Sequence, residues 1–286
     1  MQEDLTSRLV TLESNLERKK PGSVNVPQPY KRIDFNDIRL AWHRALMGLK
    51  SESKGTRLGY LWWVIEPAMH LIVYYLAFGV LLRHGGDDYV AYLLVGIVHW
   101  LWLSKSVMNA SASIMVGRGL ILQLPLHVAI FPLAEIFRDT TKQLIVTAIL
   151  LAVLWLLDYQ PGRLLLIYPI IFLIQLMLTI SLAGLVAALM PFLPDLRVIV
   201  PACLQLGMFL SGVFFTRDII PGHLQWLLNL NPVYVLLESY REILIRGNQP
   251  DWQLLGIIAI ATLVSTALVL AVLAHFNQQY ARIIQE

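Results

Sequence analysis

The sequence predicts an all-α membrane protein with six transmembrane helices, an N-terminal amphipathic interface helix, and a re-entrant helical hairpin between spans five and six. Of its 286 residues, 57% are hydrophobic and only 14% are charged, whereas a soluble domain carries about a quarter charged residues. The mean hydropathy is +0.63. This apolar surplus must face lipid, which argues against a soluble enzyme, a nucleic-acid-binding protein and a disordered chain. The single cysteine, Cys203, excludes a disulfide framework within the chain and a multi-cysteine metal site.

The first 58 residues differ from the rest of the chain. They are polar, contain half of the 22 lysines and arginines, and include no long apolar run. Residues 1–10 lack the compact apolar stretch of a secretory signal, so we expect this segment to stay in the cytoplasm. Leucines spaced by three or four residues between Leu5 and Leu16 predict a short amphipathic helix. The proline-rich stretch 21–29 predicts a linker, and residues 1–33 therefore form an extension.

A second amphipathic helix is expected within residues 34–58. Phe35, Ile38 and Trp42 belong to an apolar stripe with basic residues on the other faces. Such a helix can lie in the membrane interface or pack on a soluble partner. The two interpretations are compatible, because one face can contact lipid while another contacts protein.

Six segments are long enough to cross the bilayer, which requires about 20 mostly apolar residues. Glu66 interrupts the first and Lys105 the second. The third begins with acidic and basic residues at the spacing of helical ion pairs, which favours an interfacial or cytoplasmic start. Those residues are Glu135, Arg138, Asp139 and Lys142. The expected spans are 59–82, 89–116, 131–157, 164–190, 198–215 and 252–275.

The orientation follows from the basic residues beside the first span, because cytoplasmic flanks carry the excess of lysine and arginine. Arg44, Lys50, Lys54 and Arg57 precede this span. They place the amino terminus in the cytoplasm, and an even number of spans returns the carboxyl terminus there.

The connection 216–251 is half apolar, although it lies on the expected outer side. Asn231-Pro232 divides it into two stretches that are each too short to span, so we expect re-entrant or interfacial helices. Glu238 and Arg241 in its second half form either a charged lining or a structural clasp.

Ionisable residues inside the membrane are functional candidates because they are costly there. Glu66 and His70 lie one helical turn apart and flank Pro67. They can form a proton relay, or a hydrogen bond that staples a proline-kinked helix, and the second interpretation is favoured.

Aromatic residues deep inside the expected spans are candidates for a transport path. Tyr74, Tyr75 and Trp100 lie too far from the span ends to belong to interfacial belts. Their rings could line a path for sugars, and ordinary helix packing explains them equally well. The candidate lining residues are Tyr74, Tyr75, Phe78, Tyr92, Trp100, Phe214 and Phe215.

The chain contains no Gly-Lys pair and therefore no P-loop for nucleotide hydrolysis. Uphill transport would take its energy from another subunit or from an ion gradient. No internal repeat of the kind found in carriers is visible, which favours a partner ATPase. An ion-coupled carrier and a non-transporting membrane scaffold are the alternatives.

In this arrangement the chain resembles the membrane subunit of ABC-2 type exporters, in particular the polysaccharide permeases of capsule and O-antigen systems. The resemblance covers residues 30–284, with the transmembrane domain at 59–280. It rests on the run 58–67, Leu-Gly-Tyr-Leu-Trp-Trp-Val-Ile-Glu-Pro, on Leu94-Val95-Gly96-Ile97 with Trp100, and on Asn231-Pro232 followed by Glu238 and Arg241. An ABC-2 exporter of drugs or lipids shares this architecture and is the alternative within the family.

The resemblance implies a non-catalytic permease in the bacterial inner membrane. It implies a homodimer with two ATPase subunits that hold ATP and magnesium, while this chain holds no cofactor and no nucleic acid. Spans one and five of opposite protomers would form a channel for a lipid-linked glycan, and periplasmic export components are a further class of partner. Residues 34–50 would be the interface helix, 113–130 would carry the coupling helix, and 216–246 would supply the outer gate. The implied coupling residues are Trp42, Arg118, Asp195 and Arg197, and those of the gate are Tyr234, Glu238 and Arg241.

Overall fold

The computed structural model describes residues 34–280 apart from 56, 82–85, 87, 125, 161 and 278. Within these residues every regular element is helical, which confirms the all-α prediction. The predicted extension 1–33 lies outside the described residues. The main helices are α2 (Phe35–Gly55), α3 (Trp62–Tyr74), α4 (Tyr89–Val116), α5 (Arg118–Gln123), α6 (Ile130–Leu156), α7 (Tyr168–Leu189), α8 (Leu196–Leu210), α9 (Gln225–Asn229), α10 (Pro232–Arg241) and α11 (Trp252–His275).

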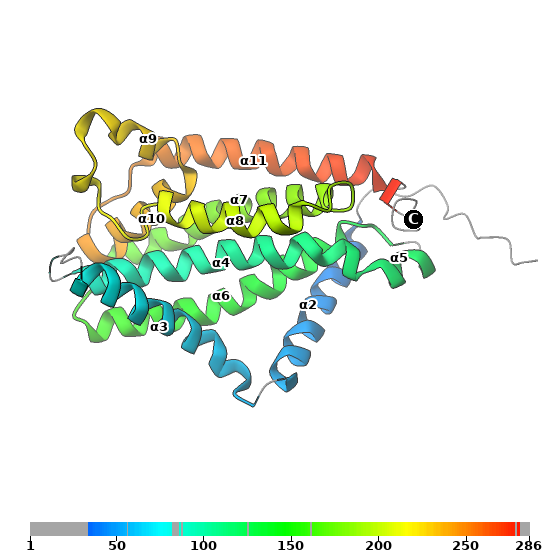
Figure 1. The fold of residues 1–286 in the computed structure, drawn as a ribbon, viewed down its shortest axis with the longest axis horizontal. Helices are drawn as coiled ribbons and strands as arrows, with labels where there is room; N and C mark the ends of the chain where they lie inside the picture. The colour runs from blue at the N-terminus through cyan, green and yellow to red at the C-terminus, as the bar shows by residue number, and fades with distance from the viewer. Residues whose placement is uncertain are drawn as a thin grey trace, which may run out of the picture.

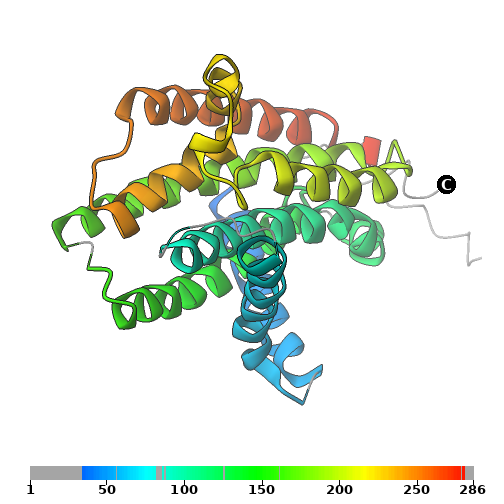
Figure 2. The same ribbon diagram turned by 60° about the vertical axis from the view of Figure 1, so that its left-hand side comes forward.

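Figure 1 shows α4, α6, α7, α8 and α11 running side by side as a bundle. We name the two ends of this bundle by the short helices that they carry. The α5 end carries α5, the turn before α8 and the last described residues, and the α9 end carries α9 and α10 (Figure 1). Helices α2 and α3 project from one side of the bundle (Figure 2), where they form two arms of a V (Figure 1).

Five helical segments in the described part of the chain are long and apolar enough to cross a membrane. They correspond to expected spans one to four and six. The fifth expected span contains the shorter helix α8, whose 15 residues extend about 22 Å at 1.5 Å per residue. A bilayer core is about 30 Å thick, so a sixth crossing is not confirmed. The five segments are Gly59–Leu81, Tyr89–Gln123, Ile130–Leu156, Gly162–Leu189 and Trp252–His275.

Helix α4 forms the centre of the bundle. It is mostly apolar, with a few polar side chains such as Lys105 and Asn109, and 19 of its 28 residues are buried, as expected of a helix with neighbours on most sides. It contacts α3, α6, α7, α8 and α10. Its buried His99 is satisfied by Val95 O at 2.8 Å and by the Tyr168 hydroxyl at 3.0 Å. Helix α4, which carries Tyr92 and Trp100, is therefore packed against other helices on several sides.

Helices α7 and α11 pack through small side chains. Gly184 lies so close to Val269 that a Cβ atom at position 184 would be 2.7 Å from its Cγ1 atom. The hydroxyl of Ser181 donates to that of Ser265 at 2.8 Å. Small residues and hydroxyl bonds are the usual means of bringing helices together in lipid, where helix association gains little from the hydrophobic effect.

The apolar stripe of α2 divides into two surfaces. Ala41, Ala45 and Leu49 are buried, and α2 packs against α6. In contrast, Phe35 is 75% exposed and Trp42 is 43% exposed. One surface of α2 thus packs within the chain, and the other is available to lipid or to a partner.

Helix α3 contains Pro67, which cannot donate a backbone hydrogen bond and is a common cause of helix kinks. The next turn is supported by His70, whose Nδ1 atom is 2.9 Å from Glu66 O. The bond is to the backbone carbonyl of Glu66, and the carboxylate of that residue points to α4 instead. Beyond Tyr74 the chain continues as a π-helical segment, Tyr75–Leu81.

Candidate functional site

A turn at residues 211–215 follows α8 and brings together several predicted site residues. Gly212 has a φ of +66°, a left-handed conformation that side chains disfavour and that ends the helix. The hydroxyl of Tyr92 shares its single proton between Phe215 O at 2.5 Å and Gly212 O at 3.1 Å. Tyr89 donates to Phe214 O at 3.0 Å. Two tyrosine hydroxyls of α4 therefore hold this turn by its backbone carbonyl groups.

Arg241 holds the same turn from α10 and is completely buried. Its Nη1 atom donates to Gly212 O at 2.9 Å, and its Nη2 atom donates to Val213 O at 3.2 Å. The Nε atom donates to Tyr92 O at 3.3 Å. Of the two sequence-based interpretations of Arg241, a charged lining or a structural clasp, these contacts match the clasp.

Four aromatic rings gather beside this turn. The Phe214 ring is stacked on Phe78 at 4.7 Å, and meets Tyr74 edge-on at 4.6 Å and Phe209 at 5.2 Å. The structure thus brings predicted lining residues from α3, from the π-helical segment that follows it and from the turn after α8 into one cluster.

The other predicted lining residues differ in exposure. Trp100 is buried farther along α4, where it lies against Gly207 of α8. Tyr75 is 39% exposed, and Phe215 is half-buried. Of the predicted lining side chains named here, Tyr75 is thus the most open within a single protomer.

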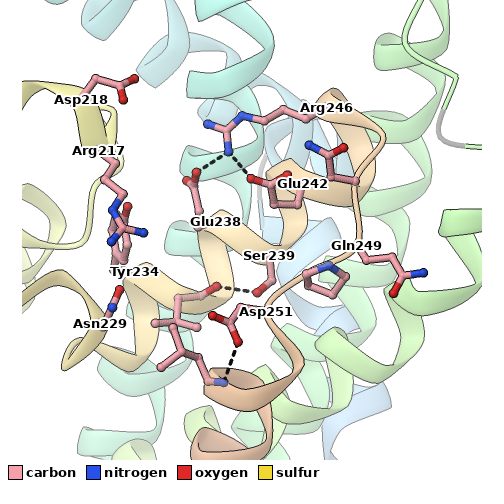
Figure 3. Close-up of a pocket in the computed structure, with 14 residues that line it drawn as sticks. Arg217, Asp218, Asn229, Tyr234, Glu238, Ser239, Glu242, Arg246, Gln249 and Asp251 are labelled. Atoms are coloured by element: carbon pink, nitrogen blue, oxygen red, sulfur yellow. Dashed lines mark hydrogen bonds and ion pairs between the residues drawn. The ribbon is translucent and has the colours of Figure 1, made fainter. Parts of the chain in front are cut away.

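A polar pocket of about 740 Å³ opens at the α9 end beside α10 (Figure 3), and we refer to it as the α10 pocket. Its wall includes the predicted gate residues Tyr234 and Glu238. The Nη1 atom of Arg246 donates to Glu242 Oε1 at 2.6 Å and also to Glu238. Burial alone would lower the pKa of Arg246, but these two carboxylates raise it above its ordinary value. The lining residues are Arg217, Asp218, Asn229, Tyr234, Val235, Glu238, Ser239, Glu242, Arg246, Asn248, Gln249, Pro250, Asp251 and Leu254.

Tyr234 is the residue of this pocket whose hydrogen bonding is incomplete. Its side chain is 3% exposed, and its hydroxyl has no partner among the described residues. Its ring packs on Gly212, where an added Cβ atom would be 2.6 Å away. Tyr234 therefore joins the α10 pocket to the 211–215 turn.

A second polar region, which we call the charged network, lies among α2, α3, α4 and α6. Lys105 pairs with Glu66 across α3 and α4. Lys142 lies 2.6 Å from Glu52 and connects α6 to α2. The sequence suggested ion pairs within α6, and Arg138 and Glu135 form one at 2.5 Å.

The links of this network between helices were not predicted. The sequence did contain a signal for one of them, because Glu66 and Lys105 each interrupt an apolar span and have opposite charges. Asn109 extends the network by donating to Asp139 Oδ2 at 2.7 Å.

The predicted coupling residues lie toward the α5 end. Arg118 and Arg197 line one groove of about 480 Å³ together with Met108, Met115 and Met190. Asp195, two residues before Arg197, is exposed. Trp42 lies on α2, where its ring meets Phe137 of α6 at 6.0 Å. The structure therefore brings Arg118 and Arg197 together, while Trp42 belongs to a different surface.

The segment between α5 and α6 is tied to the last described residues. Val128 N donates to Asn277 Oδ1 at 2.8 Å, and the Tyr280 hydroxyl donates to Ala188 O at 3.0 Å. Burial raises the pKa of Tyr280 to about 12.

His127 lies in the same segment and accepts a hydrogen bond from Ala129 N through Nδ1 at 3.2 Å. Burial lowers its pKa, and Asp37 partly offsets that effect.

Within the described residues, no three histidine, cysteine, aspartate or glutamate side chains are grouped closely enough to hold a metal ion.

Comparisons with known proteins agree with this architecture. Residues 42–245 match the family described as ABC-2 type transporter. The chain is 27% identical over 218 residues to the O-antigen export system permease protein RfbA of Myxococcus xanthus, and the aligned region covers 76% of this chain and 84% of that relative. It is 24% identical over 237 residues to a Klebsiella pneumoniae protein of the same name, covering 82% and 91%. It is 25% identical over 225 residues to the polysialic acid transport protein KpsM of Escherichia coli, covering 75% and 84%.

Proposed function

Because the chain belongs to the ABC-2 type transporter family, we propose that it is the membrane permease of an ATP-driven exporter that moves a lipid-linked surface polysaccharide across the bacterial inner membrane. The observation that carries this proposal is the similarity over most of the chain to permeases named for O-antigen export and polysialic acid transport. The permease itself performs no chemistry.

The energy comes from a separate ATPase subunit that binds ATP and magnesium. Its docking surface comprises the exposed side of α2 with Trp42, and the groove that contains Arg118 and Arg197. Two features support this assignment. The groove lies at the α5 end, where short connections leave charged side chains exposed, and α2 joins the bundle through the charged network. A displacement of α2 would therefore reach α6 through the ion pairs of Glu52, and α4 through the hydrogen bond between Asp139 and Asn109.

The path for the glycan lies between two copies of the chain, with α3 and α8 of opposite protomers facing each other. Both helices have long exposed apolar surfaces, including Met69 and Ile72 on α3 and Leu206 on α8. The aromatic cluster around Phe214 and the exposed ring of Tyr75 lie where these two helices border the path.

The membrane topology has six crossings, with both termini and the α5 end in the cytoplasm. Helix α8 and the 211–215 turn make the fifth crossing, and α9 and α10 dip into the outer face. Single cysteines test this arrangement in a Cys203→Ser background. A membrane-impermeant maleimide should label Asp218→Cys from the outside of spheroplasts and should label Arg118→Cys only after lysis. The reverse pattern would overturn the orientation.

Purification from native membranes tests the function. A P-loop ATPase should co-purify with the chain, and the reconstituted complex should export glycolipid only when ATP is supplied. Transport by the chain alone along an ion gradient would support a carrier, the absence of any ATPase would support a scaffold, and export restricted to drugs or free lipids would support the alternative exporter class.

Paired variants test the docking surface. Arg118→Ala combined with Arg197→Ala should reduce glycan-coupled ATPase activity about tenfold, because two charges leave one groove. Arg163→Ala removes an exposed arginine before α7 and should have no effect. Equal coupling in both proteins would place the ATPase elsewhere.

A further inference from the structure

We propose that the α10 pocket is a binding site for an uncharged, hydroxyl-rich sugar unit of the exported glycan, with the Tyr234 hydroxyl as one of its hydrogen-bonding groups. This inference rests on the proposed function and specifies the class of substrate. It is argued from the size of the pocket, its charges and its incomplete hydrogen bonding.

The pocket has the size and lining of a small-molecule site. Its volume of about 740 Å³ falls within the range of about 300–1,000 Å³ that ligand pockets occupy. Polar and apolar groups contribute about equally to its wall, whereas most such pockets are predominantly apolar. Amide groups of Asn229, Asn248 and Gln249 and a seryl hydroxyl accompany the charged residues. Amides both donate and accept hydrogen bonds, which matches sugar hydroxyls.

The charges of the pocket favour a neutral ligand. Four carboxylates line the pocket (Asp218, Glu238, Glu242 and Asp251), whereas Arg217 and Arg246 are its two guanidinium groups. Arg246 is occupied by Glu238 and Glu242, and Arg217 Nε donates to Gln225 Oε1 at 3.0 Å. Even with the buried Arg241 behind the wall, the carboxylates remain in excess. A glycan that carries carboxylates or phosphates would be repelled.

The Tyr234 hydroxyl supplies the second, independent observation. A buried hydroxyl without a partner costs free energy, so its retention needs an explanation. Figure 3 shows Tyr234 on α10 among the polar groups of the pocket. Neighbouring side chains cover this hydroxyl almost completely, so a sugar hydroxyl in the pocket would supply the missing partner once those side chains move aside.

The position of the pocket connects it to the proposed glycan path. The Tyr234 ring packs on Gly212, and the same turn carries Phe214 and Phe215. The Tyr234 ring therefore connects a sugar held in the pocket to the turn that carries the aromatic cluster, at the proposed outer end of the path.

Saccharide binding to the purified permease–ATPase complex in nanodiscs tests the proposal by saturation-transfer difference NMR. The probes are neutral trisaccharides of glucose, mannose, galactose and rhamnose, with trigalacturonic acid as the acidic probe. At least one neutral probe should bind, and more tightly than the acidic one. Tyr234→Phe should weaken that binding about fivefold, the usual value of one neutral hydrogen bond. Its melting temperature should be unchanged or higher, because the variant loses an unpartnered hydroxyl.

Tyr240→Phe is the matched control. Tyr240 also has a buried hydroxyl without a partner among the described residues, but its ring stacks on His99 at 3.7 Å and does not line the pocket. This variant should bind the neutral probe as the wild type does. A second variant, Asp218→Lys, should raise the relative affinity for trigalacturonic acid.

Three results would overturn the inference. These are no binding by any neutral probe, tighter binding of the acidic probe, or equal binding by Tyr234→Phe and the wild type. ATP-driven export of the native glycan is measured on the same preparations. Intact export without probe binding refutes only the sugar site, whereas probe binding without glycan export supports the pocket and refutes the proposed function.

Discussion

The guanidinium carbon of Arg241 lies 3.4 Å from the centroid of the Tyr92 ring. The two residues also share an acceptor, because both donate to Gly212 O. One cation–π contact and a set of charge-assisted bonds therefore join α4, α10 and the turn after α8. This contact gives the α9 end of the bundle a buried polar centre that apolar packing alone would not provide.

Replacing Arg241 by lysine should destabilise the protein by about 3 kcal/mol, because an ammonium group cannot reach all three backbone carbonyls or stack flat on the Tyr92 ring. In detergent the melting temperature should fall by roughly 5–10 °C. Arg217→Lys, at an exposed position, should change it by less than about 2 °C. Similar losses in both variants would contradict the role assigned to Arg241.

Gly96→Ala tests how tightly the same contact is packed. A Cβ atom at position 96 would lie 2.6 Å from Arg241 Nη2, so the guanidinium would have to move at a cost of about 1–3 kcal/mol. Gly256→Ala on α11 is the control, since nothing lies within 4 Å of its added Cβ atom. That change should be neutral or stabilising, because alanine favours helices. Thermal unfolding of the two variants decides the question.

His127 should make stability depend on pH. Its pKa in the folded protein is below the ordinary value of 6.5. As the pH falls below about 6.5, the unfolded chain therefore binds more protons at this residue than the folded protein does. The contribution of His127 is fully present above pH 6.5 and decreases toward lower pH. His127→Asn preserves an acceptor for Ala129 N and cannot titrate. The wild type should lose more thermal stability than this variant between about pH 7.5 and pH 5, and parallel profiles would refute the assignment.

The Glu66–Lys105 pair should pass a charge-swap test. Glu66→Lys alone places two ammonium groups together, and Lys105→Glu alone places two carboxylates together. The double swap should recover most of the lost stability. Because both residues lie within expected membrane spans, where an unpaired charge is costly, we expect each single swap to destabilise the protein and the double swap to show a favourable coupling energy. Melting temperatures of the four proteins give this value, and additive losses would show that the residues do not interact.

Much of the helical content could be predicted because an apolar run of transmembrane length is a local property of the sequence. The charged start of α6 was also predicted as a site of helical ion pairs, and Arg138 with Glu135 confirms that expectation. The end of α8 was harder to predict. The apolar pattern continues to Phe215, whereas the helix stops at Leu210, because the turn after it depends on Tyr92 and Arg241 from distant parts of the chain.

The candidate site was predictable as a set of residue types and unpredictable as a set of contacts. Tyr234, Glu238 and Arg241 were identified from their place after Asn231-Pro232, yet Arg241 turns inward while the other two line the α10 pocket. Helical periodicity cannot distinguish these directions when both faces of α10 have neighbours. Arg246 reaches Glu238 and Glu242 in the wall of the α10 pocket from the π-helical segment Glu242–Arg246. No sequence pattern indicated that segment.

The attachment of α8 at one end has a mechanical consequence. Its outgoing turn is held by Tyr89, Tyr92 and Arg241, whereas only Val200 and Met208 of the helix itself are buried. Any tilt of α8 would therefore pivot about Gly212, leaving Phe214 almost stationary and carrying Arg197 through the largest arc. A push delivered near Arg197 would act with the full leverage of a rod about 22 Å long, so a modest force at that end would suffice to swing the helix.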